Sequence, residues 1–394
     1  MTKAKKILTA AVCILCLTAG LTGCAKNSQD TAATKSSSKA ESSDNQKIKE
    51  LSDKVEKLEN TLSDIFGEDI ANFDGDDDSD ITGDIHPIYD DTAVVEAYRS
   101  GDDSKLTDDK DKYILKELKK AVGEIITDNM SEYDKEKAVY DYVFAQTHFN
   151  ENSLAAITDD DESYDPYGFF HDHSTICVGN ATTLKLFFDV LGIESKIIHS
   201  TENGEHAWNV VKIDGNWYHV DVTFDAGDKT PAYTYFNVPD SVKNDGSYPW
   251  DTDDFPACTA TDLCYICQNA KKLDSVYDIP DQLKKTADSG NETAYMSLSI
   301  PNGVDSDAAA EQITNIIAGL YSDKYYFSPS SAIISSDGKL ASFCVTIGSS
   351  SDISDDDLPA DNILDVDYQK LADKFSDVLD TELTPDFDIT SAKG

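Results

Sequence analysis

Apolar residues recur at helical spacing in three segments between residues 115 and 191, and they alternate with polar residues in the segments that follow. Ser131 and Asp134 are start signals for the second helix, and Gly192 is a stop signal after the third. Asp214-Gly215 is a strong hairpin-turn signal. Helices followed by an antiparallel sheet are typical of an α+β fold. The predicted helices cover 115–126, 138–143 and 177–191, the predicted strands 195–199, 206–213 and 217–223, and a loop is predicted at 158–167.

A second set of such patterns predicts a small α/β accessory domain over residues 286–394, after a main domain over residues 85–285. Asp337-Gly338 is a hairpin signal within it. Nothing in this part suggests chemistry, so we expect a structural role. Its predicted strands cover 294–300, 331–335 and 340–347, and its predicted helices cover 308–320 and 367–380.

Residues 47–66 carry a short heptad pattern with lysine and glutamate between the apolar positions, which predicts a short coiled-coil helix. A helix of this length is marginal alone, so it would either self-associate or pack on its own domain; we favour self-association. The apolar positions are Ile48, Leu51, Val55, Leu58, Leu62 and Ile65.

Two polar segments flank this helix. Residues 25–46 have almost no large apolar side chains and are predicted to be a disordered tether. Residues 67–84 are rich in aspartate. From Asp78 onwards they resemble the first part of a calcium loop, but Tyr89 stands where a bidentate glutamate is needed, so we interpret the segment as an acidic linker.

The first 24 residues resemble a secretory signal peptide. Three lysines precede an apolar run over residues 7–21, which is too short to span a bilayer comfortably. The run ends in Leu21-Thr22-Gly23-Cys24, which resembles a bacterial lipobox; an ordinary secretory signal is the alternative. We expect Cys24 to be lipidated and the protein to be anchored at the outer face of the cell membrane.

The chain is strongly acidic. Its formal net charge is −42, which becomes −45 when the three lysines of the signal peptide are removed, and Arg99 is the only arginine. Phosphate backbones and anionic lipid headgroups repel such a surface, so nucleic-acid binding is excluded and the lipid must hold the protein at the membrane. The expected partners are protein or peptide substrates, which include cell-wall or surface proteins.

Two clusters invite a metal interpretation. Cys264-x-x-Cys267 lies close to Cys258, but no second CxxC pair accompanies it, which favours a buried thiol cluster or one structural disulfide over redox or zinc chemistry. His171-Asp172-His173 lies ahead of Cys177, where a surface loop is the better interpretation. We therefore expect no metal and no cofactor.

Cys177, His206 and Asp221 occur in the order nucleophile, base and orienting carboxylate. Cys177 begins a predicted helix, whose dipole and free N–H groups would stabilise a thiolate, and an imidazolium at His206 would lower the thiol pKa further. A two- or four-residue turn centred on Asp214-Gly215 pairs Asp221 with Trp208 and places His206 diagonally from Asp221 on the same face, whereas a three-residue loop would separate them. Free cysteines are commonly buried and inert, but this combination favours a catalytic triad.

Acyl transfer at a thiol also needs donors for the oxyanion. The backbone N–H of Cys177 is a natural first donor. The candidates for the second donor and for the substrate cleft are Tyr164, Tyr167, Asn180 and Trp208.

Residues 85–285 resemble a bacterial transglutaminase-like domain, which has the papain-like thiol fold. The resemblance implies that Cys177, His206 and Asp221 are catalytic. Thr175-Ile176 and Asn180 depart from the Gly-Val before the cysteine and the aromatic residue after the glycine that the family often has, which bears on substrate fit. The motifs that carry the resemblance are Met130 to Ala138, Tyr167-Gly168, Cys177-x-Gly179-x-Ala181, Leu191-Gly192-Ile193, His206-Ala207-Trp208-Asn209, Trp217 to Thr223 and Tyr235-Phe236-Asn237.

We therefore expect a cell-surface lipoprotein that transfers or hydrolyses acyl groups of glutamine or peptide amides through a thioester at Cys177. The alternative is a non-catalytic, membrane-tethered binding or scaffolding module that uses the same cleft. The intact set of three residues favours the enzyme.

Overall fold

The computed structural model describes residues 86–147, 163–173, 175–225, 231–244, 246–321, 326–348, 363–379 and 384–385. The expected signal peptide, tether, coiled-coil helix and acidic linker, together with Cys24, lie outside these residues. Within the described ranges, none of the helices combines the length and the apolar character that crossing a membrane requires.

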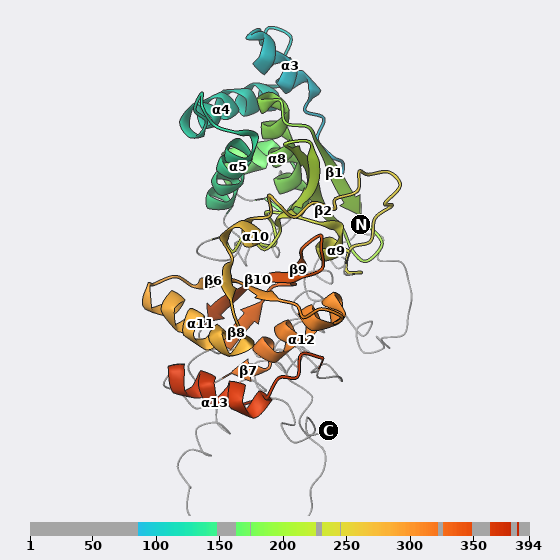
Figure 1. Cartoon of the computed structure of the whole chain (residues 1–394). Coiled ribbons are helices and arrows are strands. Elements are labelled where there is room, and N and C mark those ends of the chain that lie inside the picture. Colours follow the sequence, from blue (N-terminus) through green and yellow to red (C-terminus); the bar gives the residue numbers. More distant parts are fainter. Residues whose placement is uncertain are drawn as a thin grey trace, which may run out of the picture. The chain divides into compact units, whose positions relative to one another are not determined.

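Helices form the fold as far as residue 191 (Figure 1). The second and third predicted helices are confirmed, and the first lies within α4 apart from its last residue. The helix α5 starts before its apolar pattern, because polar capping residues form its first turn. Ser131 and Asp134 form a capping box there. Gly192 ends α8 with a φ of 76°. The helices are α3 (Thr92–Ser100), α4 (Asp109–Ile125), α5 (Glu132–Gln146), α7 (Pro166–Asp172) and α8 (Cys177–Leu191).

An antiparallel sheet with the strand order β1-β2-β3-β4 follows the helices. The predicted hairpin turn at Asp214-Gly215 is confirmed, and its loop has two residues: both have positive φ, 49° and 89°, and Ile213 pairs with Asn216. The third strand ends at Val220, before its predicted limit, and the N–H of Asp221 just beyond it donates to the carbonyl of Tyr235. The strands are β1 (Ser195–Ser200), β2 (His206–Ile213), β3 (Asn216–Val220) and β4 (Phe236–Val238).

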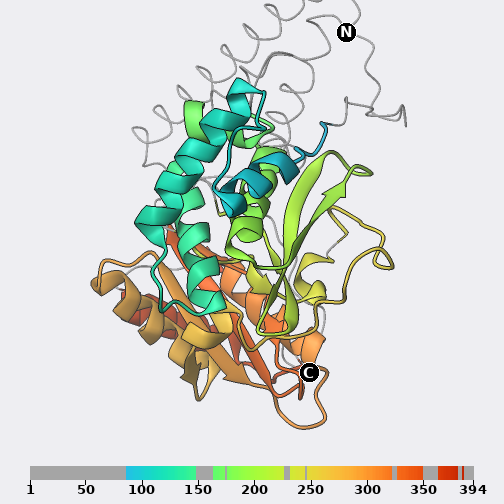
Figure 2. The same ribbon diagram turned by 90° about the horizontal axis from the view of Figure 1, so that it is seen from above.

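The two faces of this sheet pack differently. The helices lie along one side of this sheet (Figure 2). Val211 and Tyr218 belong to the main hydrophobic core together with residues of these helices. Trp208 and Val210 belong to a separate cluster on the other face, with the buried Cys258. The alternation along the strand separates the two sets. Helices on one side of an antiparallel sheet confirm the predicted α+β class.

A second sheet has the order β5-β6-β10-β8, with β5 parallel to β6 and β9 paired to β10. Phe343 of β10 lies in a core with the helices α11, α12 and α13, whereas Cys344 faces Val242 and Cys264 in another cluster. The elements are α9 (Asp240–Lys243), α10 (Tyr265–Asn269), β5 (Lys271–Leu273), η3 (Val276–Asp278), α11 (Ile279–Asp288), β6 (Thr293–Ser299), α12 (Ser306–Ala318), β7 (Leu320–Tyr321), β8 (Tyr326–Pro329), β9 (Ile333–Ile334), β10 (Leu340–Gly348), α13 (Tyr368–Leu379) and β11 (Thr384–Pro385).

This second sheet starts before residue 286, where its domain was expected to begin. β5 pairs with β6, and Leu273 and Leu283 lie in the same core as Phe343. A strand of three residues has too short a pattern to be found from the sequence. The five cysteines of the described residues are free thiols, and Cys264 and Cys344 share one buried cluster.

Candidate active site

Cys177 is the first residue of α8 and is partly buried. Ile176 before it is extended, and its N–H donates to the carbonyl of Ser163 over 3.1 Å. This bond fixes the entry of the chain into the helix. The Cys177 Sγ lies 3.8 Å from the backbone carbonyl oxygen of Glu205, immediately before β2.

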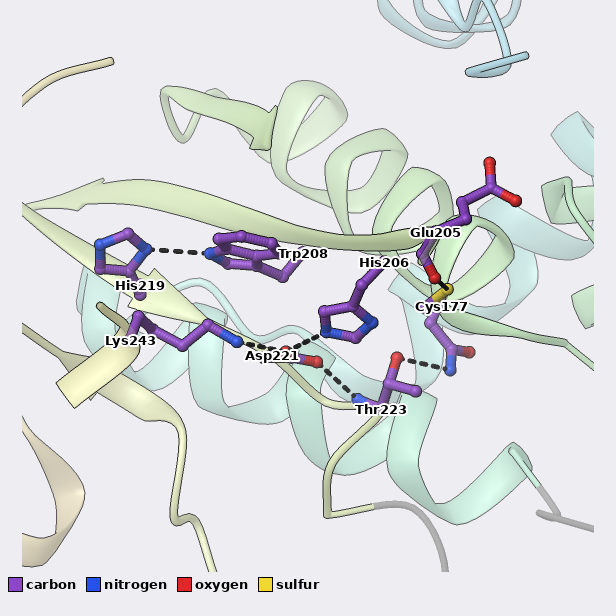
Figure 3. A network of polar contacts seen from close by, with 9 residues as sticks. Cys177, Glu205, His206, Trp208, His219, Asp221, Thr223 and Lys243 are labelled. Carbon is purple, nitrogen blue, oxygen red and sulfur yellow. Dashed lines mark hydrogen bonds and ion pairs between the residues drawn. The ribbon is translucent and has the colours of Figure 1, made fainter. Parts of the chain in front are cut away.

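The hairpin brings His206 and Asp221 into contact, as the predicted register requires. His206 Nε2 lies 2.8 Å from Asp221 Oδ2, and the two side chains are 5% and 1% exposed. The other carboxylate oxygen, Oδ1, accepts the N–H of Thr223 over 3.1 Å. The imidazole lies between Asp221 and Cys177, with its second nitrogen on the Cys177 side (Figure 3). The geometry therefore combines a thiol, a candidate base and an orienting carboxylate.

Residues 119–222 match the profile of the transglutaminase-like superfamily, and this segment holds all three side chains. The chain contains a transglutaminase-like domain. Its fold is one of cysteine-dependent acyl transferases and hydrolases. No curated protein matches the chain. A solved structure described as the crystal structure of a TGase is 24% identical, with a TM-score of 0.24, over 32% of this chain and 36% of its own, so the match spans about a third of that protein.

The thiol of the transglutaminase-like domain does not have the lowered pKa that the helix start led us to expect. Burial raises the pKa of Cys177 to about 11, and the charges of Asp221 and Glu205 add to the rise. The backbone N–H groups of Ala207 and Val178 oppose it. Desolvation by burial thus outweighs the effect of the helix terminus on the thiol pKa.

Lys243 is a site residue that the sequence did not indicate. It ends the four-residue helix α9, it is 5% exposed, and its Nζ lies 2.8 Å from the same Oδ2 that His206 contacts. Burial alone would raise the pKa of Asp221, but the charge of Lys243 and the hydrogen bond with His206 outweigh it and lower the pKa to about 2. A lone lysine in a polar stretch carries no sequence signal for burial.

Aromatic rings surround the imidazole. The centroids of Trp208, Phe224 and Tyr248 lie 5.5, 4.7 and 4.5 Å from that of His206. Phe224 is 46% exposed, which is unusual for a large apolar side chain in this fold. The rings limit water around the base and leave one apolar surface open beside it.

The expected cleft residues have different surroundings. The Tyr164 ring stacks on His86 and packs with Cys177 in one cluster, so it lies at the site. Tyr167 packs against Tyr113 and His171 on the helices instead. Trp208 is at the site as a wall behind His206, and its Nε1–H donates to His219 Nδ1 over 3.0 Å.

The Asn180 side chain holds the loops around the site. Its Oδ1 accepts hydrogen bonds from Thr147 and Thr175, and its Nδ2 donates to Thr223 Oγ1 over 3.2 Å. With 1% of its surface exposed, Asn180 fits a structural role better than that of an oxyanion donor. The departure from the aromatic residue of the family is thus explained by this network.

One group of possible metal ligands lies beside the site. Ligand atoms of His219, Asp240 and Cys258 lie within 4.8 Å of one another. Since the Trp208 N–H can only donate, His219 Nδ1 is the acceptor, and the ring donates through Nε2 to Asp240 Oδ1 over 2.8 Å. A metal at Nε2 would have to displace this bond, so the group is better suited to hydrogen bonding. His171 and Asp172 end α7 as an exposed pair, which fits a surface position although it is helical.

Glu205 links two histidines whose partners the sequence could not name. Its carboxylate accepts the N–H of His86 over 2.8 Å and contacts the ring Nδ1 of the same residue. It also lies 2.8 Å from His199 Nε2. These contacts fix the segment whose carbonyl touches Cys177.

Proposed function

We propose that this protein forms a thioester between Cys177 and the acyl group of a glutamine side chain or peptide amide, and transfers that group to an amine or to water. The observation that supports the proposal most is the placement of the Cys177 thiol at a helix start beside a buried His206–Asp221 pair. In this reaction the Sγ–C bond forms as His206 takes the thiol proton, and the C–N bond breaks as His206 returns it to the leaving nitrogen. Attack by the acceptor then releases the thiol.

The test is incorporation of a biotinylated amine into a glutamine-rich protein by the mature protein. Cys177→Ala should abolish labelling, and the matched control Cys267→Ser should retain it, because Cys267 is a half-buried thiol that packs in a cluster without Cys177. Labelling that survives Cys177→Ala would contradict the proposal. Cys177-dependent release of ammonia or peptide without labelling would identify water as the acceptor.

The raised pKa of the thiol favours a second candidate, a non-catalytic binding module that uses the same cleft. That module would retain peptide binding in Cys177→Ala and show no thioester by mass spectrometry. Trapping an acyl-Cys177 adduct with a glutamine peptide would exclude it.

We propose further that Cys24 carries the lipid that anchors the protein at the outer face of the membrane, and that residues 48–65 mediate self-association. The lipobox-like sequence and the heptad pattern support these two points. Metabolic labelling with a fatty acid should be lost in Cys24→Ser. Sedimentation of a chain that lacks residues 47–66 should report a smaller species if the heptad associates. At this location, surface proteins or cell-wall peptides are the substrates that we propose.

A further inference from the structure

Lys243 and His206 share one oxygen of Asp221. Both nitrogen atoms lie 2.8 Å from Asp221 Oδ2, and the side chains of Lys243 and Asp221 are 4% and 1% exposed. In a triad without such a lysine, the carboxylate would balance the positive charge of the base alone. In this site the ammonium group of Lys243 already balances the negative charge of the Asp221 carboxylate.

Aromatic rings enclose the ammonium. The Lys243 Nζ lies 4.3, 4.7 and 4.9 Å from the ring centroids of Trp208, Phe224 and Tyr235. Cation–π attraction stabilises the charge at this position, and burial protects it from screening by salt. The ammonium group therefore contributes to the electrostatic potential at Asp221 with little screening.

A thiolate at Cys177 requires a proton on His206. The resulting imidazolium and the ammonium of Lys243 would both contact Asp221 Oδ2. Two positive charges that contact the same oxygen atom repel each other. The repulsion therefore opposes transfer of the Cys177 proton to His206. The raised pKa of Cys177, which burial causes in the first place, has the same direction.

We propose that Lys243 is a positioning residue that keeps the Cys177 thiol protonated in the resting site, so that loss of the proton accompanies attack on the substrate. The inference concerns the nucleophile of the proposed reaction and rests on that proposal. During attack the Sγ–C bond forms while the proton passes from sulfur to His206. The negative charge that develops on the substrate oxygen then stabilises the imidazolium that Lys243 disfavours at rest.

The short helix α9, which carries Lys243, is held in place through its first residue, Asp240. Asp240, on the same helix, accepts from the N–H of Cys258 over 2.9 Å and from His219 over 2.8 Å. His219 in turn is held by the indole of Trp208. The other titratable groups that face the cluster are Cys177 on α8, Tyr140 on α5, Glu205 before β2, Asp225 after β3, and Tyr235 and Tyr248.

The experiment is the pH profile of Cys177 alkylation by iodoacetamide, followed by peptide mapping so that each cysteine is read separately. In the wild type the rate should be low at pH 7 and rise only in the alkaline range. In Lys243→Met, Asp221 keeps the Thr223 N–H and pairs with His206 alone, so alkylation at pH 7 should be about tenfold faster or more. A profile in Lys243→Met that overlies the wild type, or a slower reaction, would overturn the inference.

Two further variants keep the test decisive. Lys243→Gln removes the charge but can still donate to Asp221, and should behave like Lys243→Met if the latter does not fold. Lys243→Arg retains the charge and should restore the wild-type profile. Amine incorporation is measured in parallel. A shifted alkylation profile without incorporation would reject only the acyl-transfer proposal. Cys177-dependent incorporation with an unchanged alkylation profile would reject only the role of Lys243.

Discussion

Gly179 lies directly against the backbone carbonyl of Ser163. A Cβ placed on Gly179 would be 2.2 Å from the Ser163 oxygen and 3.0 Å from a methyl group of Thr175. The same carbonyl accepts the N–H of Ile176, immediately before the nucleophile. Gly179 therefore allows the segment with Tyr164 to approach the first turn of α8.

We expect Gly179→Ala to lower the free energy of unfolding by about 1–3 kcal/mol, because the closest contact of the added Cβ is with the backbone carbonyl of Ser163. Urea denaturation measures this change. Gly123→Ala is a matched control, since Gly123 lies in the exposed part of α4 and an added Cβ meets nothing within 4 Å. That control should be more stable by about 0.5–1 kcal/mol. Equal effects of the two substitutions would contradict the close-approach explanation.

The Asp221–Lys243 pair should be strongly coupled in stability. Asp221→Asn leaves the buried ammonium without its counter-charge, so we expect a loss of about 3–5 kcal/mol. Adding Lys243→Met removes that unpaired charge, and the double variant should lose clearly less than the two single variants together. The cycle is measured by denaturant unfolding. Additive effects of the two substitutions, such as those expected when Asp221→Asn is combined with Gly123→Ala on α4, would show that the pair is not coupled.

The contact between His206 and Asp221 could be predicted from the sequence, because the Asp214-Gly215 turn sets the register and the register sets the face. Lys243 could not, since it reaches Asp221 from a four-residue helix, which is too short to have a recognisable pattern. The raised pKa of Cys177 could not be predicted from the sequence either. The helix start is a local feature that the sequence shows, but the desolvation that outweighs it comes from tertiary packing.

The same distinction holds in the accessory part. The hairpin signal at Asp337-Gly338 was correct, because β9 and β10 pair on either side of it, with Ile333 opposite Ser342. The start of the sheet at Lys271 was missed, because a three-residue strand is defined only by its partner β6. Short elements that depend on distant partners therefore account for most of what the sequence did not reveal.

Glu136 on α5 should make stability decrease as the pH rises. Burial raises its pKa from 4.5 to about 8, although the hydrogen bond from Asn237 opposes the rise. Between these values the folded protein binds a proton that the unfolded chain has released, so stability is lost with increasing pH at up to about 1.4 kcal/mol per pH unit. Asp225, whose pKa burial raises to about 7, has an effect of the same sign.

The substitution Glu136→Gln isolates this contribution. It keeps an oxygen for Asn237 and removes the ionisation, so the stability difference between variant and wild type should grow in favour of the variant from pH 5 to pH 8. Urea denaturation at four pH values gives the difference directly. A constant difference across that range would show that Glu136 does not titrate in the folded protein between those values.

Phe224 is expected to contribute to substrate binding and little to stability. Its ring is 46% exposed and lies 4.7 Å from that of His206, so it presents apolar surface where a substrate would meet the base. Phe224→Ala should raise KM for a glutamine peptide by about three- to tenfold, which corresponds to the loss of one apolar contact. Ile88→Ala is the matched control: its side chain is 38% exposed and it should leave KM unchanged. Both variants should keep their Tm within a few degrees, because exposed side chains contribute little to folding. An unchanged KM in Phe224→Ala, or an equal rise in Ile88→Ala, would remove Phe224 from the binding surface.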